Sequence, residues 1–154
     1  MAQLDATDIS ILSMLQDDAR CTNKEIAGKL HMTTTPIFER VKRLERTGFI
    51  KKYVALLDRD KLDLHLVAFC NVQLKEHSAV FLQKFEKDVQ SLEEVQEVYH
   101  VAGLFDYLLK VVIKDMTAYQ SFVADKLAAL DNIGRVQSAF VMKEILHTTS
   151  YKLG

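Results

Sequence analysis

Residues 22–50 have the sequence TNKEIAGKLHMTTTPIFERVKRLERTGFI, and this stretch decides the fold of the N-terminal third of the chain. Thr22 and Glu25 have the spacing of a capping box, in which each side chain accepts a hydrogen bond from the backbone amide of the other residue. A helix is therefore expected to begin at Asn23. Its apolar pattern stops after two turns, at residues 31–32, where we expect a tight turn.

A longer helix follows that turn. Thr33 is a suitable capping residue, and Pro36 fits the first turn of a helix, where a missing N–H group costs little. Gly48 ends the pattern. The apolar residues repeat at helical spacing: Ile37, Val41 and Leu44. A short helix, a turn of about three residues and a longer helix form a helix-turn-helix motif, whose second helix enters the major groove of DNA.

The face opposite these apolar residues is polar and mostly basic, with Phe38 and Arg40 on its flanks. Residues 20–52 hold nine Lys and Arg against three Glu, although the 154-residue chain has a formal net charge of only −1. Such segregated charge is expected when one part of a protein touches DNA phosphates. The alternative is a basic face that is only solvated. The candidate DNA-binding residues are Thr34, Thr35, Glu39, Lys42, Arg43 and Arg46.

The segments on either side of this motif complete an N-terminal domain. Apolar residues at helical spacing predict a first helix over residues 9–15 that ends near Asp17 and Asp18. Residues 49–58 (FIKKYVALLD) are a β-rich run, either a wing or a linking strand. A charged cluster at residues 59–63 marks the domain boundary. The expected division is a winged-helix-like helix-turn-helix domain at 1–52, a linker strand or hinge at 53–63, and an oligomerisation and effector domain at 64–154.

The second half of the chain alternates strand-like and helical patterns. The expected strands, rich in β-branched and aromatic residues, are residues 64–74, 95–102, 107–114 and 136–146, and the helical patterns span residues 82–92 and 119–130. The order β-α-β-β-α-β predicts a ferredoxin-like domain, with both helices on one face of an antiparallel sheet. The whole chain is therefore expected to be an α+β protein.

The predicted sheet is apolar on both faces, although its helices cover only one. On the first strand Ala68 and Cys70 point to one side, and Val67 and Phe69 point to the other. An exposed apolar face of this size is not tolerated on a monomer, and a second copy of the same sheet is the simplest cover. We therefore expect at least a homodimer, with two recognition helices and a DNA site of two-fold symmetry.

The sequence offers little for catalysis, metal binding or membrane insertion. It lacks the nucleotide-binding, nucleophile-elbow and zinc-protease motifs, its five His are dispersed, and Cys21 and Cys70 have no metal-ligand spacing. No apolar run approaches the roughly 18 residues of a membrane span. We expect a cytoplasmic protein that is not an enzyme, with no cofactor, no metal and two reduced cysteines.

One loop has the chemistry of a ligand site. Residues 101–107 (VAGLFDY) join two predicted strands and combine Gly103, which permits close backbone approach, with the carboxylate of Asp106. Backbone N–H groups beside Gly103 can receive a carboxylate and Asp106 can accept an ammonium group, which are the two charges of a free amino acid. The alternative is a hairpin turn that Asp106 only caps. The candidate effector residues are Val101, Ala102, Gly103 and Asp106.

Three stretches resemble the Lrp/AsnC (feast/famine) family of transcriptional regulators, and the resemblance covers essentially the whole chain. They are Leu4-Asp5 with Asp8 and Ile9, Arg40-Val41…Leu44-Glu45…Gly48-Phe49-Ile50, and Gly103…Asp106-Tyr107. The resemblance implies DNA binding through an N-terminal helix-turn-helix domain and dimers formed by a ferredoxin-like domain. It also implies that dimers assemble into an octamer, and that an amino acid binds between dimers in many members.

Two positions depart from the family pattern. His31 stands where the family usually has Gly after the second helix, so this His has to adopt a left-handed backbone conformation. On the last strand the family often has two Thr or Ser residues, of which Ser138 matches the first and Phe140 replaces the second. The resemblance therefore adds Ser138, from a neighbouring subunit, to the candidate effector residues.

Three functions are compatible with these features. The first is a sequence-specific regulator whose DNA affinity or oligomeric state is tuned by a small amino acid. The second is an effector-free architectural protein that binds double-stranded DNA, while its sheet domain only assembles subunits. The third is a ferredoxin-like enzyme or metabolite-binding module with an incidental helical domain.

Overall fold

The computed structural model describes residues 3–153 and divides into two compact units. The first comprises the chain up to Leu56 together with the C-terminal residues from Leu146, and the second comprises Leu57–Ile145. The division after Leu56 falls inside the segment expected to be the linker, residues 53–63. The C-terminal residues differ from the expectation, because they group with the helical unit and not with the sheet.

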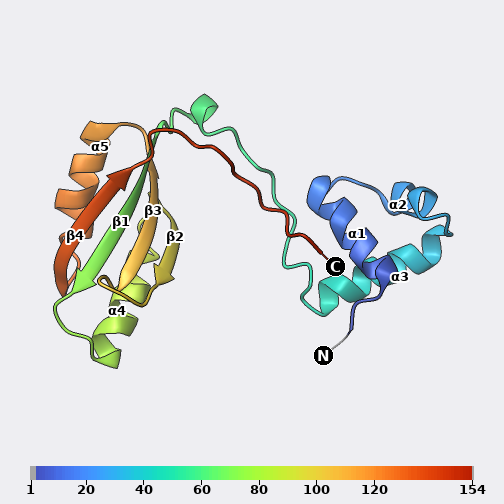
Figure 1. Ribbon diagram of the computed structural model, residues 1–154, viewed down its shortest axis with the longest axis horizontal. Coiled ribbons are helices and arrows are strands. Elements are labelled where there is room, and N and C mark those ends of the chain that lie inside the picture. The colour runs from blue at the N-terminus through green and yellow to red at the C-terminus, as the bar shows by residue number, and fades with distance from the viewer. Residues whose placement is uncertain (1–2, 154) are drawn as a thin grey trace. The chain divides into compact units, whose positions relative to one another are not determined.

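Three helices build the first unit: α1 (Ala6–Asp17), α2 (Asn23–Lys29) and α3 (Thr34–Arg46), as Figure 1 shows. Both α1 and α2 begin with a capping box, and α2 starts at the predicted residue. His31, after α2, has a φ of 54°, so this non-glycine residue does adopt the left-handed conformation. Gly48 has a φ of 79° and lets the chain turn away from α3.

An apolar core holds these helices together. Its buried side chains come from all three helices and include the predicted residues of α3: Ile11, Leu12, Ile26, Ala27, Ile37, Val41 and Leu44. Full burial of a side chain of Ile or Leu size contributes about 1.5–3 kcal/mol. The longest of the three helices has only 13 residues, so packing and not intrinsic propensity stabilises them.

The segment that follows α3 contains no strand. The expectation of a wing or a linking strand at residues 49–58 is wrong, since none of these residues, all described, is in a strand. A β-rich run forms a strand only with a hydrogen-bonding partner, and no strand pairing among residues 3–153 includes this segment. Leu56 and Leu57 are 67% and 72% exposed.

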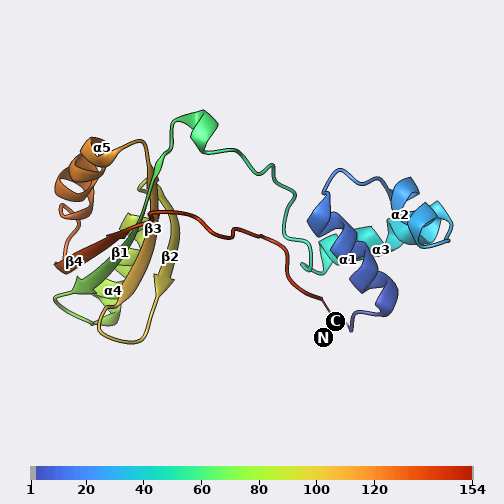
Figure 2. The same cartoon turned by 45° about the horizontal axis from the view of Figure 1, so that its top comes forward.

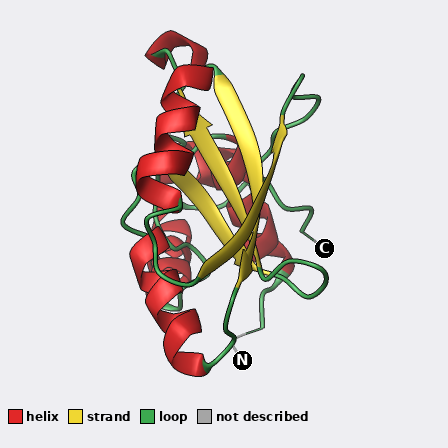
Figure 3. Cartoon of the chain, turned by 90° about the vertical axis from the view of Figure 1, so that its left-hand side faces the viewer, coloured by secondary structure: helices red, strands yellow, loops and turns green. Residues whose placement is uncertain are grey.

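The second unit is an antiparallel sheet covered on one face by two helices (Figures 1 and 3). A short 3-10 turn, Asp60–Leu62, precedes it. Its strands have the order β2-β3-β1-β4, which confirms the ferredoxin-like prediction. The elements are β1 (Leu66–Leu74), α4 (Ala79–Val89), β2 (Val95–His100), β3 (Tyr107–Ile113), α5 (Met116–Ser121) with a π-helical extension (Phe122–Leu127), and β4 (Ile133–Phe140).

The position of β4 differs from the prediction of residues 136–146. Its neighbour β1 determines both ends. Phe140 pairs with Ala68, near the first residue of β1, so the β-rich residues that follow have almost no strand left to pair with. At the other end a register shift between Gln73 and Leu74 lets β4 begin already at Ile133.

The helices bury the side chains on one face of the sheet but not those on the other. Side chains on the helix side are buried and form the second core: Ala68, Cys70, Val72, Leu109 and Val111 are among them. On the other face Phe69, Leu108 and Val112 are only half-buried, whereas Val67, which was expected on this face as well, is buried. The expected apolar face without helices is therefore present. The structure also places Val111 in the core and Val112 on this open face.

Candidate functional site

The outer face of α3 presents most of the side chains that the sequence singled out for DNA contact. Five of the six are exposed: Thr34, Thr35, Glu39, Lys42 and Arg46. Lys42 pairs with Glu45 over 3.0 Å, and its ammonium nitrogen lies 5.9 Å from the ring centre of Phe38. Surface ion pairs of this kind contribute at most about 1 kcal/mol, so a phosphate group can displace them.

The sixth candidate, Arg43, is half-buried because a carboxylate of α1 binds it. Asp8 is fully buried, and its two oxygens accept hydrogen bonds from two arginines of α3. Arg40 Nη1 donates to Oδ1 over 2.8 Å, and Arg43 Nη2 donates to Oδ2 over 2.5 Å. Arg40 also donates to Asp5 over 2.6 Å. These four residues form a charge cluster that fixes α3 to the start of α1.

The cluster keeps both carboxyl groups ionised. Burial raises the pKa of Asp8, but hydrogen bonds from Arg43 and Arg40 outweigh burial and hold this pKa below its ordinary value. The pKa of Asp5 is lowered as well, by the backbone amide of Asp8 and by Arg40. The attraction between α1 and α3 is therefore fully present at neutral pH.

Sequence reasoning named Asp8 only as part of the family resemblance and missed its role as a partner of the α3 arginines, although a signal for that role is present. Asp8 precedes the buried Ile11 and Leu12 by three and four residues, which places it on the apolar face of α1. A carboxylate on a buried helix face needs a cationic partner. Which of the basic residues of α3 supplies that partner depends on the tertiary structure.

The loop between β2 and β3 is a closed turn with an exposed tip. The N–H of Val101 donates to the carbonyl oxygen of Asp106, and the N–H of Asp106 donates to the carbonyl oxygen of Val72, each over 2.9 Å. Ala102 and Gly103 are exposed, and Leu104 at the tip is 76% exposed. Gly103 has a φ of 145°, which favours glycine at this position.

The side chain of Asp106 makes its contacts outside this turn. Its Oδ2 accepts a hydrogen bond from the N–H of Leu74 over 2.7 Å, and Nε2 of His77 lies 3.0 Å from its Oδ1. The carboxylate therefore ties the loop to the end of β1. An ionised carboxylate has about four acceptor positions, so these two contacts leave room for a further donor.

Ser138 lies apart from this loop within the chain. It is on β4 at one edge of the sheet, whereas β2, which leads into the loop, is the opposite edge strand. The Tyr119 hydroxyl donates to the Ser138 hydroxyl oxygen and lies 3.1 Å from the sulfur of Cys70. Phe140 packs edge-on against the Tyr119 ring, with 5.0 Å between ring centres. The structure thus brings the loop residues together but not Ser138 with them.

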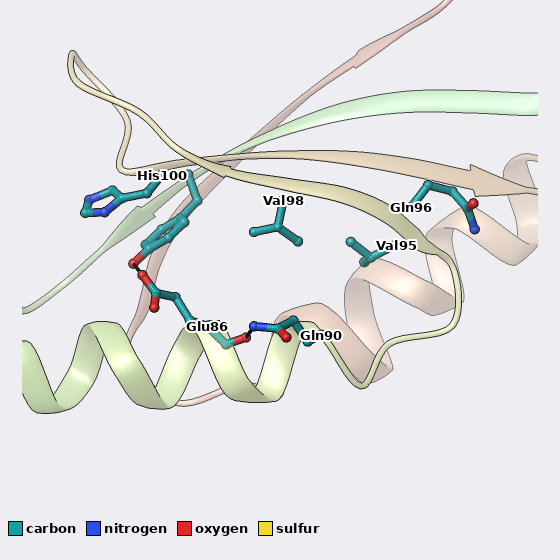
Figure 4. Close-up of a pocket in the computed structure, with 7 residues that line it drawn as sticks. Glu86, Gln90, Val95, Gln96, Val98 and His100 are labelled. Carbon is teal, nitrogen blue, oxygen red and sulfur yellow. Dashed lines mark hydrogen bonds between the residues drawn. The ribbon is translucent and has the colours of Figure 1, made fainter. Parts of the chain in front are cut away.

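A cavity of about 480 Å³ lies between α4 and β2, and its lining includes Glu86, Gln90 and His100 (Figure 4). The Tyr107 hydroxyl donates to Glu86 Oε1 over 2.9 Å, and the His100 ring stacks on the Tyr107 ring. Sequence reasoning did not point to this cavity. Its only signal is the three-residue spacing of Val95 and Val98, which breaks the alternation of a strand and coincides with a register shift in β2.

Two further features bear on function. Among residues 3–153, no group of three or more His, Cys, Asp or Glu side chains has the arrangement of a metal site. None of the helices described in that range is long and apolar enough to span a membrane.

Comparison with known proteins assigns both units. Residues 4–51 match the family model described as "Winged helix-turn-helix DNA-binding", and residues 67–151 match the one described as "Lrp/AsnC ligand binding domain". The leucine-responsive regulatory proteins of Escherichia coli K12 and Klebsiella pneumoniae are each 40% identical to the chain over 142 residues. That match covers 92% of this chain and 87% of each relative.

Solved structures agree with these matches over nearly the full length. A transcriptional regulator from Neisseria meningitidis, determined as a complex with L-Met, has a TM-score of 0.93 and 37% sequence identity. An AsnC family transcriptional regulator from Agrobacterium tumefaciens has a TM-score of 0.92 and 36% identity. In both cases the comparison covers 97% of each chain.

Proposed function

The chain belongs to the Lrp/AsnC family and is a DNA-binding transcriptional regulator, and from this premise we propose that the outer face of α3 reads its operator and that a small amino acid regulates it. One observation carries the proposal. The charge cluster around Asp8 fixes α3 from the inside, while Lys42 and Arg46 stay exposed on the outside. A recognition helix needs this combination of fixed orientation and accessible cations.

The position of each side chain along α3 suggests its role. Thr34 and Thr35 are at the start of the helix, where recognition helices contact base edges. Glu39 can accept a hydrogen bond from a cytosine amino group. Lys42 and Arg46 lie further along the helix and suit phosphate groups. Arg43, with its guanidinium on Asp8, acts as a positioning residue and contributes to DNA binding mainly through the orientation of α3.

The open face of the sheet supports a homodimer, which is further proposed to assemble into an octamer. Phe69, Leu108 and Val112 lie on this face with no helix over them. Burial of apolar area against a second copy gives about 25 cal/mol per Å². Two-fold symmetry then presents two copies of α3 to one DNA site.

The loop between β2 and β3 is the proposed effector site. The exposed backbone at Ala102 and Gly103 receives the carboxylate of an amino acid, and the remaining acceptor positions of Asp106 receive its ammonium group. Val101 borders this site, but its own N–H already donates to the carbonyl oxygen of Asp106. The partner subunit's Ser138 is proposed to complete the site, since this chain's own Ser138 is on the opposite edge strand. The L-Met complex of the similar N. meningitidis regulator supports an amino acid as the ligand.

The family assignment does not favour the architectural alternative or the metabolite-binding module. A regulator of this kind acts on chromosomal DNA, so we propose that it works in the cytoplasm and has no catalytic role. DNase footprinting on the region upstream of the protein's own gene, with each of the twenty amino acids, tests the proposed function. A defined footprint that one amino acid shifts is expected, whereas protection without sequence preference would select the architectural alternative.

A further inference from the structure

The C-terminal residues contact the last turn of α1. The N–H of Tyr151 donates to Gln16 Oε1 over 2.7 Å, and Gln16 Nε2 donates to the carbonyl oxygen of Tyr151 over 3.2 Å. The side-chain amide of one residue therefore satisfies both backbone groups of another that is 135 positions away. In Figures 1 and 2 the red end of the chain lies beside the helical unit.

An apolar contact accompanies these hydrogen bonds. Leu153 is partly buried and packs against the core of the helical unit, to which Met14 and Leu15 of α1 also contribute. The side chain of Tyr151, by contrast, is 80% exposed, so its backbone and not its ring makes the contact. The polar part of the contact fixes which residue faces Gln16, and the apolar part anchors the segment.

We propose that residues 150–153 are a C-terminal clip, a resident part of the DNA-binding unit that docks on α1 through Gln16 and Leu153. The clip gives this unit a second connection to the sheet, which is covalent along the chain from β4 and non-covalent where the clip docks on α1. Residues 57–65 lead from the helices to β1, and residues 141–149 lead from β4 back to α1. The C-terminus thereby limits the positions that the DNA-binding unit can take relative to its own sheet.

The length of the second connection makes this limit effective. The N–H of Val141 still donates to the carbonyl oxygen of Val67 over 2.9 Å, so the chain is held by the sheet up to that point. The roughly ten residues from there to Tyr151 span at most about 36 Å when extended. Closing this loop removes conformational freedom that a single linker leaves in place. Opening the clip should therefore weaken the binding of DNA by the intact protein. With the clip open, the DNA-binding unit has more conformational freedom to lose on binding than with the clip docked.

A matched pair of variants of the full chain tests the clip. Gln16→Ala removes both hydrogen bonds, and Ala has a high helix propensity, so α1 itself is not weakened. Tyr151→Ala removes an exposed ring but keeps the backbone groups that Gln16 binds. We expect the amide at position 151 to exchange its hydrogen at least about tenfold faster in Gln16→Ala than in the wild type, and at the wild-type rate in Tyr151→Ala. Leu153→Asp should accelerate the exchange as well.

The clip would be overturned if the amide at position 151 exchanged its hydrogen at the same rate in Gln16→Ala and in the wild type. It would also be overturned if Tyr151→Ala accelerated this exchange as much as Gln16→Ala does. This readout needs no DNA and stands whether or not an operator is found. The second readout is affinity for a duplex from the protein's own upstream region. A several-fold loss in Gln16→Ala is expected, with Tyr151→Ala unchanged. Full affinity in a variant whose position 151 exchanges freely would contradict the role of the second connection.

Discussion

The Asp8 carboxylate lies 2.5 Å from the Arg43 guanidinium and thereby joins the first helix of the DNA-binding unit to its recognition helix. The Asp8 side chain is 1% exposed and that of Arg43 is 38% exposed, so the pair has one member shielded from water and one at the surface. Arg40 occupies the second oxygen of the same carboxylate. The orientation of α3 therefore depends on an anion that is shielded from the solvent.

Replacement of this anion should lower stability strongly. Asp8→Asn leaves the guanidinium groups of Arg40 and Arg43 without their carboxylate. We expect the free energy of unfolding in urea to fall by about 3 kcal/mol, the lower end of the range for broken buried pairs, because the arginines are partly exposed. Asp17→Asn, at the exposed end of α1, is the matched control and should change it by less than about 0.5 kcal/mol. A loss of equal size in both variants would show that the cluster stabilises the fold no more than an exposed carboxylate does.

The same cluster predicts a dependence on pH. The pKa of Asp8 is lowered in the folded protein, so its ionised form stabilises the fold. That contribution is complete above the pKa of an unfolded Asp, about 4, and is lost as the pH falls through the lower folded-state pKa. Urea unfolding from pH 6 to pH 3 should show a steeper loss of stability for the wild type than for Asp8→Asn. Parallel curves would contradict the assignment, whatever the other carboxyl groups contribute to both.

Adjacent valines of β3 should respond differently to a buried charge. Val112 lies on the open face of the sheet, so Val112→Lys should leave a folded protein that sediments as a smaller species than the wild type. Val111 is fully buried under the helices, so Val111→Lys should prevent folding of the sheet domain. Circular dichroism and sedimentation velocity distinguish these results. A folded Val112→Lys variant with the wild-type sedimentation coefficient would refute assembly through this face.

Amino-acid binding by the proposed effector loop should depend on Asp106 and not on the exposed tip of the loop. Asp106→Ala removes the acceptor for the N–H of Leu74 as well as the proposed acceptor for an ammonium group. Calorimetry with the twenty amino acids is expected to find at least one that binds the wild type and binds Asp106→Ala at least about tenfold more weakly, a loss of about 1.4 kcal/mol. Leu104→Ala, at a 76% exposed position in the same loop, is the control and should bind normally. Equal binding by the Asp106 variant would leave this carboxylate with a structural role only.

The elements of the first unit were predictable because their signals are local. Thr22 with Glu25, and the spacing of Ile37 and Val41, specify a helix start and a buried face within one or two turns. Such features depend on neighbours in the sequence, so no tertiary information is needed.

The features that sequence reasoning missed depend on partners far away in the chain. The end of β4 follows from where β1 begins, and residues 49–58 form no strand because no partner strand pairs with them. The helical angle of Arg43 predicts a position on the outer face, but the length of its side chain lets the guanidinium reach back to Asp8. The contact of Gln16 with Tyr151 leaves no trace in either local sequence.

The outer face of α3 is proposed to bind DNA, and a salt titration of operator binding tests this role most directly. The double variant Lys42→Ala/Arg46→Ala keeps the charge cluster around Asp8 and should remain folded and assembled. The dimer carries both substitutions in each of its two copies of α3, so four phosphate contacts are lost at a two-fold site if both residues contact phosphates. Each lost contact reduces the slope of log affinity against log salt concentration by about 0.9, so the double variant should bind more weakly with a slope reduced by about 3.6. The control Lys87→Ala, an exposed lysine of α4, should change neither quantity. A folded double variant with wild-type affinity and slope would contradict the claim.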